Sequence, residues 1–203
     1  MIDFQNNIGA WIVLLITVAV SLLTLFANPA ILNKCVLRPY EVWRGRHFDT
    51  LYLSGFVHGS MGHLLVNMFS FYFFAFALEK HIGTSAFVIG YLIAIIFSSL
   101  PSLYLHRNDM NYATLGASGG VSAVIFAHVI FYPTHTIYMM PLPIPIPAWL
   151  YAIGYLAYSF YAGRRSGGRI NHDAHFAGAL FGVLWILAIE PSAFSTLAAK
   201  LFN

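Results

Sequence analysis

Long apolar segments that carry almost no charge restrict the fold of this 203-residue chain more than any other feature. Only 8% of the residues are Asp, Glu, Lys or Arg and 59% are apolar, whereas about a quarter of an ordinary soluble domain is charged. A helix needs about 20 apolar residues to cross a bilayer, so the chain has room for about six crossings. We therefore predict an all-α fold, a polytopic membrane protein built as a six-transmembrane-helix bundle in a lipid bilayer.

Proline, glycine and charged residues mark where the apolar segments are expected to end. Residues 1–203 are predicted to form a single membrane domain, with spans at roughly 9–27, 63–80, 84–105, 118–132, 147–162 and 173–190. The first segment lacks the basic leader and the cleavage site of a secretory signal, which favours a retained helix. The connection 28–60 mixes basic and aromatic residues, which is typical of short helices in the headgroup region. The proline-rich stretch 133–147 is expected to be only a connection.

Charge and cysteine content argue against several classes of function. The net charge of +3 is spread thinly along the chain, without a dense basic run, so no nucleic-acid partner is expected. The single cysteine, Cys35, rules out an intrachain disulfide and an iron-sulfur site. We expect no metal and no organic cofactor, and the oligomeric state stays open.

The residues that are able to carry chemistry lie at the starts of the second, fourth and sixth predicted spans. These spans run in the same direction, so their N-terminal ends share one membrane face. Ser118 opens the fourth span between glycines and His175 opens the sixth, and an imidazole within reach of a serine hydroxyl makes it a nucleophile. His63 and Asn67 lie four residues apart at the start of the second span, on one helix face. Together with the backbone N–H of Ser118, they are candidate donors to an oxyanion.

The sequence also predicts that the fourth and sixth spans pack closely. Ala174, Gly178 and Gly182 recur every four residues, the small-residue pattern of tightly packed membrane helices. His175 shares a helix face with Gly178, so this packing would bring His175 towards Ser118.

These motifs, taken together and in this order, resemble the rhomboid family of intramembrane serine proteases. The matching segments are Phe56-Val57-His58 followed by His63 and Asn67, Gly116-Ala117-Ser118-Gly119, and Ala174-His175 followed by Gly178 and Gly182. The resemblance implies that Ser118 is the nucleophile and His175 the general base of a dyad, with an oxyanion hole formed by His63, Asn67 and the Ser118 N–H. It also implies that the substrates are transmembrane proteins, and we expect the chain in a bacterial inner (cell) membrane.

Other matches and departures accompany the resemblance. His58 matches a further histidine of the family, and Glu79 an acidic residue at the end of the second span. Ser122 stands where the family often has an aromatic residue beside the histidine. The pair Trp43-Arg44 lies further upstream than a Trp-Arg pair usual in the family.

Two other classes of function are compatible with parts of the sequence. A catalytically inactive rhomboid-like protein would bind membrane clients without cutting them, although such proteins usually lose the serine or the histidine. A metal or proton transporter would use His172, Asp173 and His175 as ligands, but Asp173 is more simply explained as the cap of the sixth span. The chain also lacks the two matched halves with broken helices that mark many transporters.

The orientation in the membrane is predicted differently by two arguments. The resemblance implies a cytoplasmic N-terminus and an active-site face outside. Most of the ten Lys and Arg residues, however, lie in the connections on that same face, and the positive-inside rule favours the reverse. We expect the orientation that the resemblance implies, with the N-terminus in the cytoplasm.

Overall fold

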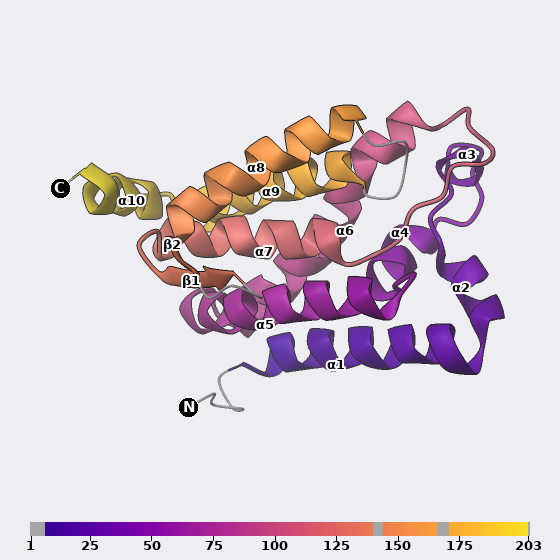
Figure 1. The fold of residues 1–203 in the computed structure, drawn as a ribbon, viewed down its shortest axis with the longest axis horizontal. Helices are drawn as coiled ribbons and strands as arrows, with labels where there is room; N and C mark the ends of the chain where they lie inside the picture. The colour runs from indigo at the N-terminus through magenta and orange to yellow at the C-terminus, as the bar shows by residue number, and fades with distance from the viewer. Residues whose placement is uncertain (1–6, 140–143, 166–170, 203) are drawn as a thin grey trace.

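The computed structural model describes residues 7–139, 144–165 and 171–202, and these ranges are mostly helical. Figure 1 shows the long helices side by side in one bundle, with the short helices gathered at one end. The long helices are α1 (Ile8–Leu22, continued by a π-helical turn Leu23–Ala27), α5 (Met61–Ile82), α6 (Thr84–Leu105), α7 (Ser118–Phe131), α8 (Ala148–Arg165) and α9 (His172–Ile189). The connection after α1 holds α2 (Pro29–Cys35), α3 (Pro39–Val42), α4 (Thr50–Leu53) and a 3-10 turn (Ser54–Phe56).

Polar side chains and glycine explain where the helices begin and end. The Ser60 hydroxyl accepts the His63 N–H at 3.2 Å at the start of α5, and Gly83, with φ +82°, ends that helix. The Asn171 side chain accepts the Ala174 N–H at 3.0 Å at the start of α9. The prediction that Asp173 caps this helix is therefore wrong. Asp173 lies in the first turn, where the negative charge of a carboxylate interacts favourably with the helix dipole without capping the helix.

Helix α7 is enclosed by the rest of the bundle. Every residue from Gly119 to Phe131 is buried, and the helix packs against α5, α6, α8, α9 and the helix α10 (Ser192–Phe202). Because protein surrounds it on all sides, α7 does not need the length of a lipid-facing helix. It has only 14 residues.

By length and composition, four helices in the described part of the chain are able to cross a membrane: Ile8–Ala27, Met61–Ile82, Thr84–Leu105 and His172–Ile189. Two further apolar helices, Ser118–Phe131 and the segment Ala148–Ala157 of α8, are shorter. The chain is thus a mostly helical polytopic membrane protein. The predicted count of six spans exceeds the four that meet the length expected of a crossing helix.

Two elements were not expected from the sequence. The stretch 133–147 contains a β-hairpin, in which β1 (Thr136–Met139) pairs antiparallel with β2 (Ile144–Pro147). The all-α prediction is corrected at this point. The prolines of β2 are compatible with it because a two-stranded ribbon has free edges. After α9, the amphipathic helix α10 (Ser192–Phe202) packs on α7 and α9.

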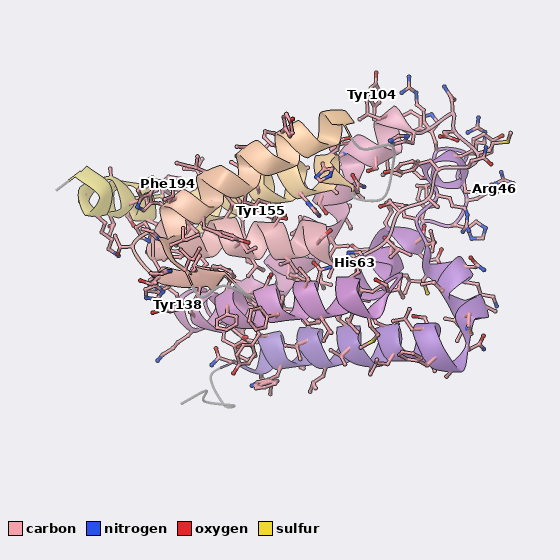
Figure 2. All side chains as sticks on the ribbon, viewed as in Figure 1. Arg46, His63, Tyr104, Tyr138, Tyr155 and Phe194 are labelled. Atoms are coloured by element: carbon pink, nitrogen blue, oxygen red, sulfur yellow. The ribbon has the colours of Figure 1, made fainter. Side chains whose placement is uncertain are left out.

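The N-terminal ends of α5, α7 and α9 lie at the same end of the bundle, next to α2–α4, while α10 and the hairpin lie at the opposite end (Figure 1). His63, labelled in Figure 2, points into the region where these N-terminal ends meet. The candidate site is therefore built at one end of the molecule.

Candidate active site

The turn before α7 requires glycine. Gly116 has φ +118°, and a Cβ atom built on it would lie 2.5 Å from Cε1 of His63. Its N–H donates to the carbonyl of Ser54 at 2.8 Å. The turn before α7 is thus hydrogen-bonded to the 3-10 turn on one side and covered by the His63 ring on the other. It delivers Ser118, half-buried, as the first residue of α7.

Glycines also allow α7 and α9 to approach until their backbones touch. A Cβ atom on Gly178 would overlap the carbonyl oxygen of Gly119, and one on Gly182 would overlap that of Ala123. Gly119 follows Ser118 directly, and Gly178 lies one helical turn after His175. This backbone contact brings the start of α7 against the start of α9.

His175 lies among aromatic rings at this junction. Its ring centroid is 5.8 Å from that of His172 and 5.8 Å from that of Tyr155 on α8. His63 and His172 are both close enough to interact with His175 electrostatically. In the described part of the chain, Ser118 and His175 are not hydrogen-bonded to each other. Catalytic hydrogen bonds are often long without substrate and tighten when it binds.

Donors for an oxyanion surround the same turn. As the first residues of a helix, Ser118 and Gly119 have N–H groups with no carbonyl four residues back in the helix to accept them. Asn67 is buried, and its Nδ2 donates one hydrogen to the carbonyl of His63 at 3.1 Å. This bond orients the amide and leaves a second hydrogen on Nδ2. No hydrogen bond between Asn67 and Ser118 is formed in the described residues.

His58 ties the turn to α1. Burial, with a smaller effect of nearby His63, lowers the pKa of His58 to about 3, so its ring is neutral. Its Nε2 accepts the Ala117 N–H at 3.4 Å, so the proton is on Nδ1, which contacts Ser21 Oγ at 2.8 Å. The Ser21 hydroxyl in turn donates to the carbonyl of Phe56 at 3.1 Å. A chain of hydrogen bonds therefore links α1 to the residue before Ser118.

The proposed transport ligands are not arranged as a metal centre. His172 is buried and Asp173 is exposed. Among the residues that the structure describes, no three His, Cys, Asp or Glu side chains are placed to hold a metal ion.

Two residues at the site were missed from the sequence. Tyr155 contacts both the His175 ring and the Ser122 hydroxyl, and Asn171 caps α9 and bonds Ser102 Oγ at 2.6 Å. Tyr155 lies within an aromatic-rich helix and matches no motif, so no local signal distinguished it. Asn171 directly precedes α9, and its preference for the cap position was the available signal.

Fold and site together define a class of protein: a helical membrane bundle whose enclosed central helix begins at a serine, at the end of the bundle where two neighbouring helices have histidines in their first turns. The chain belongs to the rhomboid family, because the model of the rhomboid domain matches residues 39–191. Members of this family are membrane-embedded, are typically intramembrane serine proteases and act on membrane-protein substrates.

Individual relatives agree with the family. The chain is 30% identical over 135 residues to "Rhomboid protein 1, mitochondrial" of Saccharomyces cerevisiae, covering 65% of this chain and 39% of the relative. It is 28% identical over 167 residues to "RHOMBOID-like protein 12, mitochondrial" of Arabidopsis thaliana, covering 75% and 49%. It is 29% identical over 163 residues to "Presenilin-associated rhomboid-like protein A, mitochondrial" of Danio rerio, covering 79% and 39%. The chain spans less than half the length of these relatives.

These relatives overturn the predicted localisation. All three are mitochondrial proteins by name, so the expectation of a bacterial inner membrane is wrong. The expectation rested on the resemblance to the family as a whole. Hydropathy does not distinguish a bacterial membrane from an organellar one, because both present a hydrocarbon core of similar thickness.

Proposed function

We propose that this chain is an intramembrane serine endopeptidase that cuts transmembrane proteins through a dyad of Ser118 and His175. One observation carries the proposal: the glycine contact of α7 with α9 brings the start of α7, where Ser118 is half-buried, against the start of α9, which holds His175. The His63 ring covers the turn that precedes Ser118. The proposed nucleophile, base and backbone donors therefore belong to helix starts at the same end of the bundle.

The reaction follows from these positions. His175 takes the hydroxyl proton as Ser118 Oγ attacks the peptide carbonyl, and the carbonyl oxygen becomes an oxyanion. The intermediate collapses when His175 returns the proton to the leaving amine, which leaves an acyl group on Ser118. Water, deprotonated by His175, then attacks this ester and releases the second product.

The oxyanion hole would be formed by the Ser118 N–H, the free hydrogen of Asn67 Nδ2 and the imidazole of His63. The dipole of α7 adds to this stabilisation, because its N-terminus carries partial positive charge. Removing one donor of this kind typically costs about 3 kcal/mol in the transition state.

The length of α7 supports a site below the membrane surface. Its 14 residues extend about 21 Å, whereas the hydrocarbon core is about 30 Å thick. We propose six crossings, including α7 and α8, whose apolar segments are shorter than those of the other four, which sets Ser118 within the bilayer. Water must then reach Ser118 through the end of the bundle at which α5, α7 and α9 begin.

The substrates would be membrane proteins whose transmembrane segments unwind near the cut. A helical peptide bond is shielded by its own hydrogen bonds, so Ser118 cannot reach it until the helix opens. The names of the relatives lead us to propose the mitochondrial inner membrane as the location.

The test is cleavage of a single-span reporter protein by the purified chain in detergent, with EDTA present throughout. The native chain is compared with Ser118→Ala and His175→Ala, and thermal unfolding verifies that each variant is folded. Cleavage by the native chain that both substitutions abolish is the expected result.

Two results would contradict the proposal. If Ser118→Ala cuts as fast as the native chain, Ser118 is not the nucleophile. If the folded native chain and Ser118→Ala, each immobilised on an affinity resin, retain the reporter equally while neither cuts it, the chain binds clients without cutting them.

A further inference from the structure

The side chain of Tyr155, on α8, contacts both His175 and the helix that begins with Ser118. Figure 2 labels it in the interior of the bundle. Its ring is tilted by 32° relative to that of His175, with centroids 5.8 Å apart. Its hydroxyl lies 2.5 Å from Ser122 Oγ, one helical turn after Ser118. One tyrosine therefore touches the base directly and the nucleophile's helix through a hydrogen bond.

The direction of the hydrogen bonds can be assigned. Ser122 Oγ donates its single hydrogen to the carbonyl of Ser118 at 2.7 Å, a common bond of serine within a helix. At the contact with Tyr155 the Ser122 oxygen can then only accept. The chain of donors runs from the Tyr155 hydroxyl to Ser122 and from Ser122 to the Ser118 carbonyl.

The ring of Tyr155 is itself held in place. It stacks on Tyr151, one turn earlier on α8, with centroids 6.1 Å apart, and lies 6.1 Å from Phe126 of α7. Ser122 is completely buried and small, so α7 leaves room at this level for a ring from α8. The fixed ring then limits how far the His175 imidazole can rotate away from Ser118.

We propose that Tyr155 is the positioning residue of this site, which holds the His175 ring in the orientation that accepts the Ser118 proton. The inference rests on the proposed serine dyad. Tyr155 acts on the reaction through His175, against which its ring packs, and its hydrogen bond to Ser122 fixes the position of that ring.

The experiment compares Tyr155→Leu, Tyr155→Phe and a matched control, Trp149→Leu. The control removes an aromatic ring from the same helix, but Trp149 is exposed and, in the described residues, makes no ring contact with Tyr155 or His175. Two rates are measured on purified protein: cleavage of the single-span reporter, separated into kcat and KM, and covalent labelling of Ser118 by a fluorophosphonate. The labelling rate reports activation of the serine without a protein substrate.

We expect Tyr155→Leu to lower kcat and the labelling rate together by about tenfold, the upper range for an aromatic contact, with KM nearly unchanged. Tyr155→Phe keeps the ring and should retain most of both rates. Trp149→Leu should leave both rates within about twofold, since it leaves the contact of Tyr155 with His175 in place. Thermal unfolding distinguishes a loss of folded protein from a loss of rate.

The inference is overturned if Tyr155→Leu and Trp149→Leu lower the rates equally, or if Tyr155→Leu raises KM alone. It is also overturned if Tyr155→Phe is as slow as Tyr155→Leu, because the ring then contributes nothing. The proposed function fails separately: in that case the native chain itself neither cuts the reporter nor reacts with the fluorophosphonate.

Discussion

The two ends of the bundle contain the same kind of side chain and differ in what surrounds it. At the end with Ser118, the rings of His58 and His63 lie 4.9 Å apart. At the opposite end, those of His128 and His135 lie 5.5 Å apart. Histidine clusters therefore occur at both ends, and a cluster alone does not make a catalytic site.

The helix termini at the two ends are used differently. At the first end, the start of α7 leaves N–H groups without an acceptor in the helix. At the second end, the first N–H groups of α1 donate to the Glu79 carboxylate at 2.9 and 2.6 Å, and the last carbonyl oxygen of α7 is bound by a cation. There Lys200 Nζ donates to the carbonyl of Phe131, the last residue of α7, at 2.9 Å. His81 contacts the hydroxyl of Tyr132 at 3.3 Å and the Glu190 carboxylate at 3.6 Å.

The difference favours the first end for the proposed acyl transfer. An oxyanion needs donors that are already oriented, and a helix N-terminus supplies them when they are still available. At the second end, the donors at the start of α1 already bind a carboxylate, and the carbonyl oxygens at the end of α7 would repel an anion. The following variants test this contrast with paired substitutions, in order of decreasing expected effect.

The largest contrast is between His175→Gln and His81→Gln. Loss of a general base typically costs about a thousandfold in kcat, so His175→Gln should nearly abolish cleavage of the reporter. His81→Gln should cleave at close to the native rate because His81 lies at the other end. Equal losses in the two variants would show that the ends are not functionally distinct.

A second contrast concerns glycines on neighbouring helices. Gly178→Ala places a methyl group against the Gly119 carbonyl, and overpacking of this kind lowers the free energy of unfolding by about 1–3 kcal/mol. Gly154→Ala on α8, where a Cβ would meet nothing within 4 Å, should be neutral or stabilise by up to about 1 kcal/mol. Unfolding in detergent measures both. A stable Gly178→Ala protein with native activity would contradict the close contact of α7 and α9.

A third contrast concerns how the free energy of unfolding depends on pH. The pKa of His58 falls from 6.5 to about 3 on folding, so below pH 6.5 the unfolded chain binds a proton that the folded chain does not. This histidine therefore lowers the free energy of unfolding as the pH falls from about 6.5 towards 3, by at most about 1.4 kcal/mol per pH unit. His58→Gln should flatten that slope, although it loses stability at pH 7. His135→Gln, an exposed histidine at the other end, should keep it, and equal slopes in all three proteins would refute the assignment.

The smallest expected effect is that of Lys200→Met. The charge at the C-terminus of α7 stabilises the helix by about 0.3–1 kcal/mol, so the melting temperature should fall slightly and cleavage should persist. Lys80→Met removes a charge from the last turn of α5 and should lower the melting temperature by a similarly small amount. If Lys200→Met abolished cleavage at constant folded fraction, the C-terminal end would have a part in the reaction.

Local patterns predicted the parts of the site that lie within one element. The spacing of His63 and Asn67 follows from the helix repeat, and the glycines around Ser118 indicated the turn at which α7 starts. The hairpin after α7 was missed because prolines usually indicate a connection. Asp173 was predicted to cap α9, whereas Asn171 does so. Asp and Asn both favour the cap position, and these two residues are only two positions apart, so the local sequence does not distinguish them.

By itself, the sequence determined that this chain is helical, lies in a membrane and belongs with rhomboid proteins, because apolar content and local motifs depend on neighbouring residues alone. Tertiary structure decided that α7 is enclosed and short, that His58 is tied to Ser21, and that the ring beside His175 comes from α8. These features join residues that are far apart in the chain. Their contacts depend on how the helices pack, which no local pattern encodes.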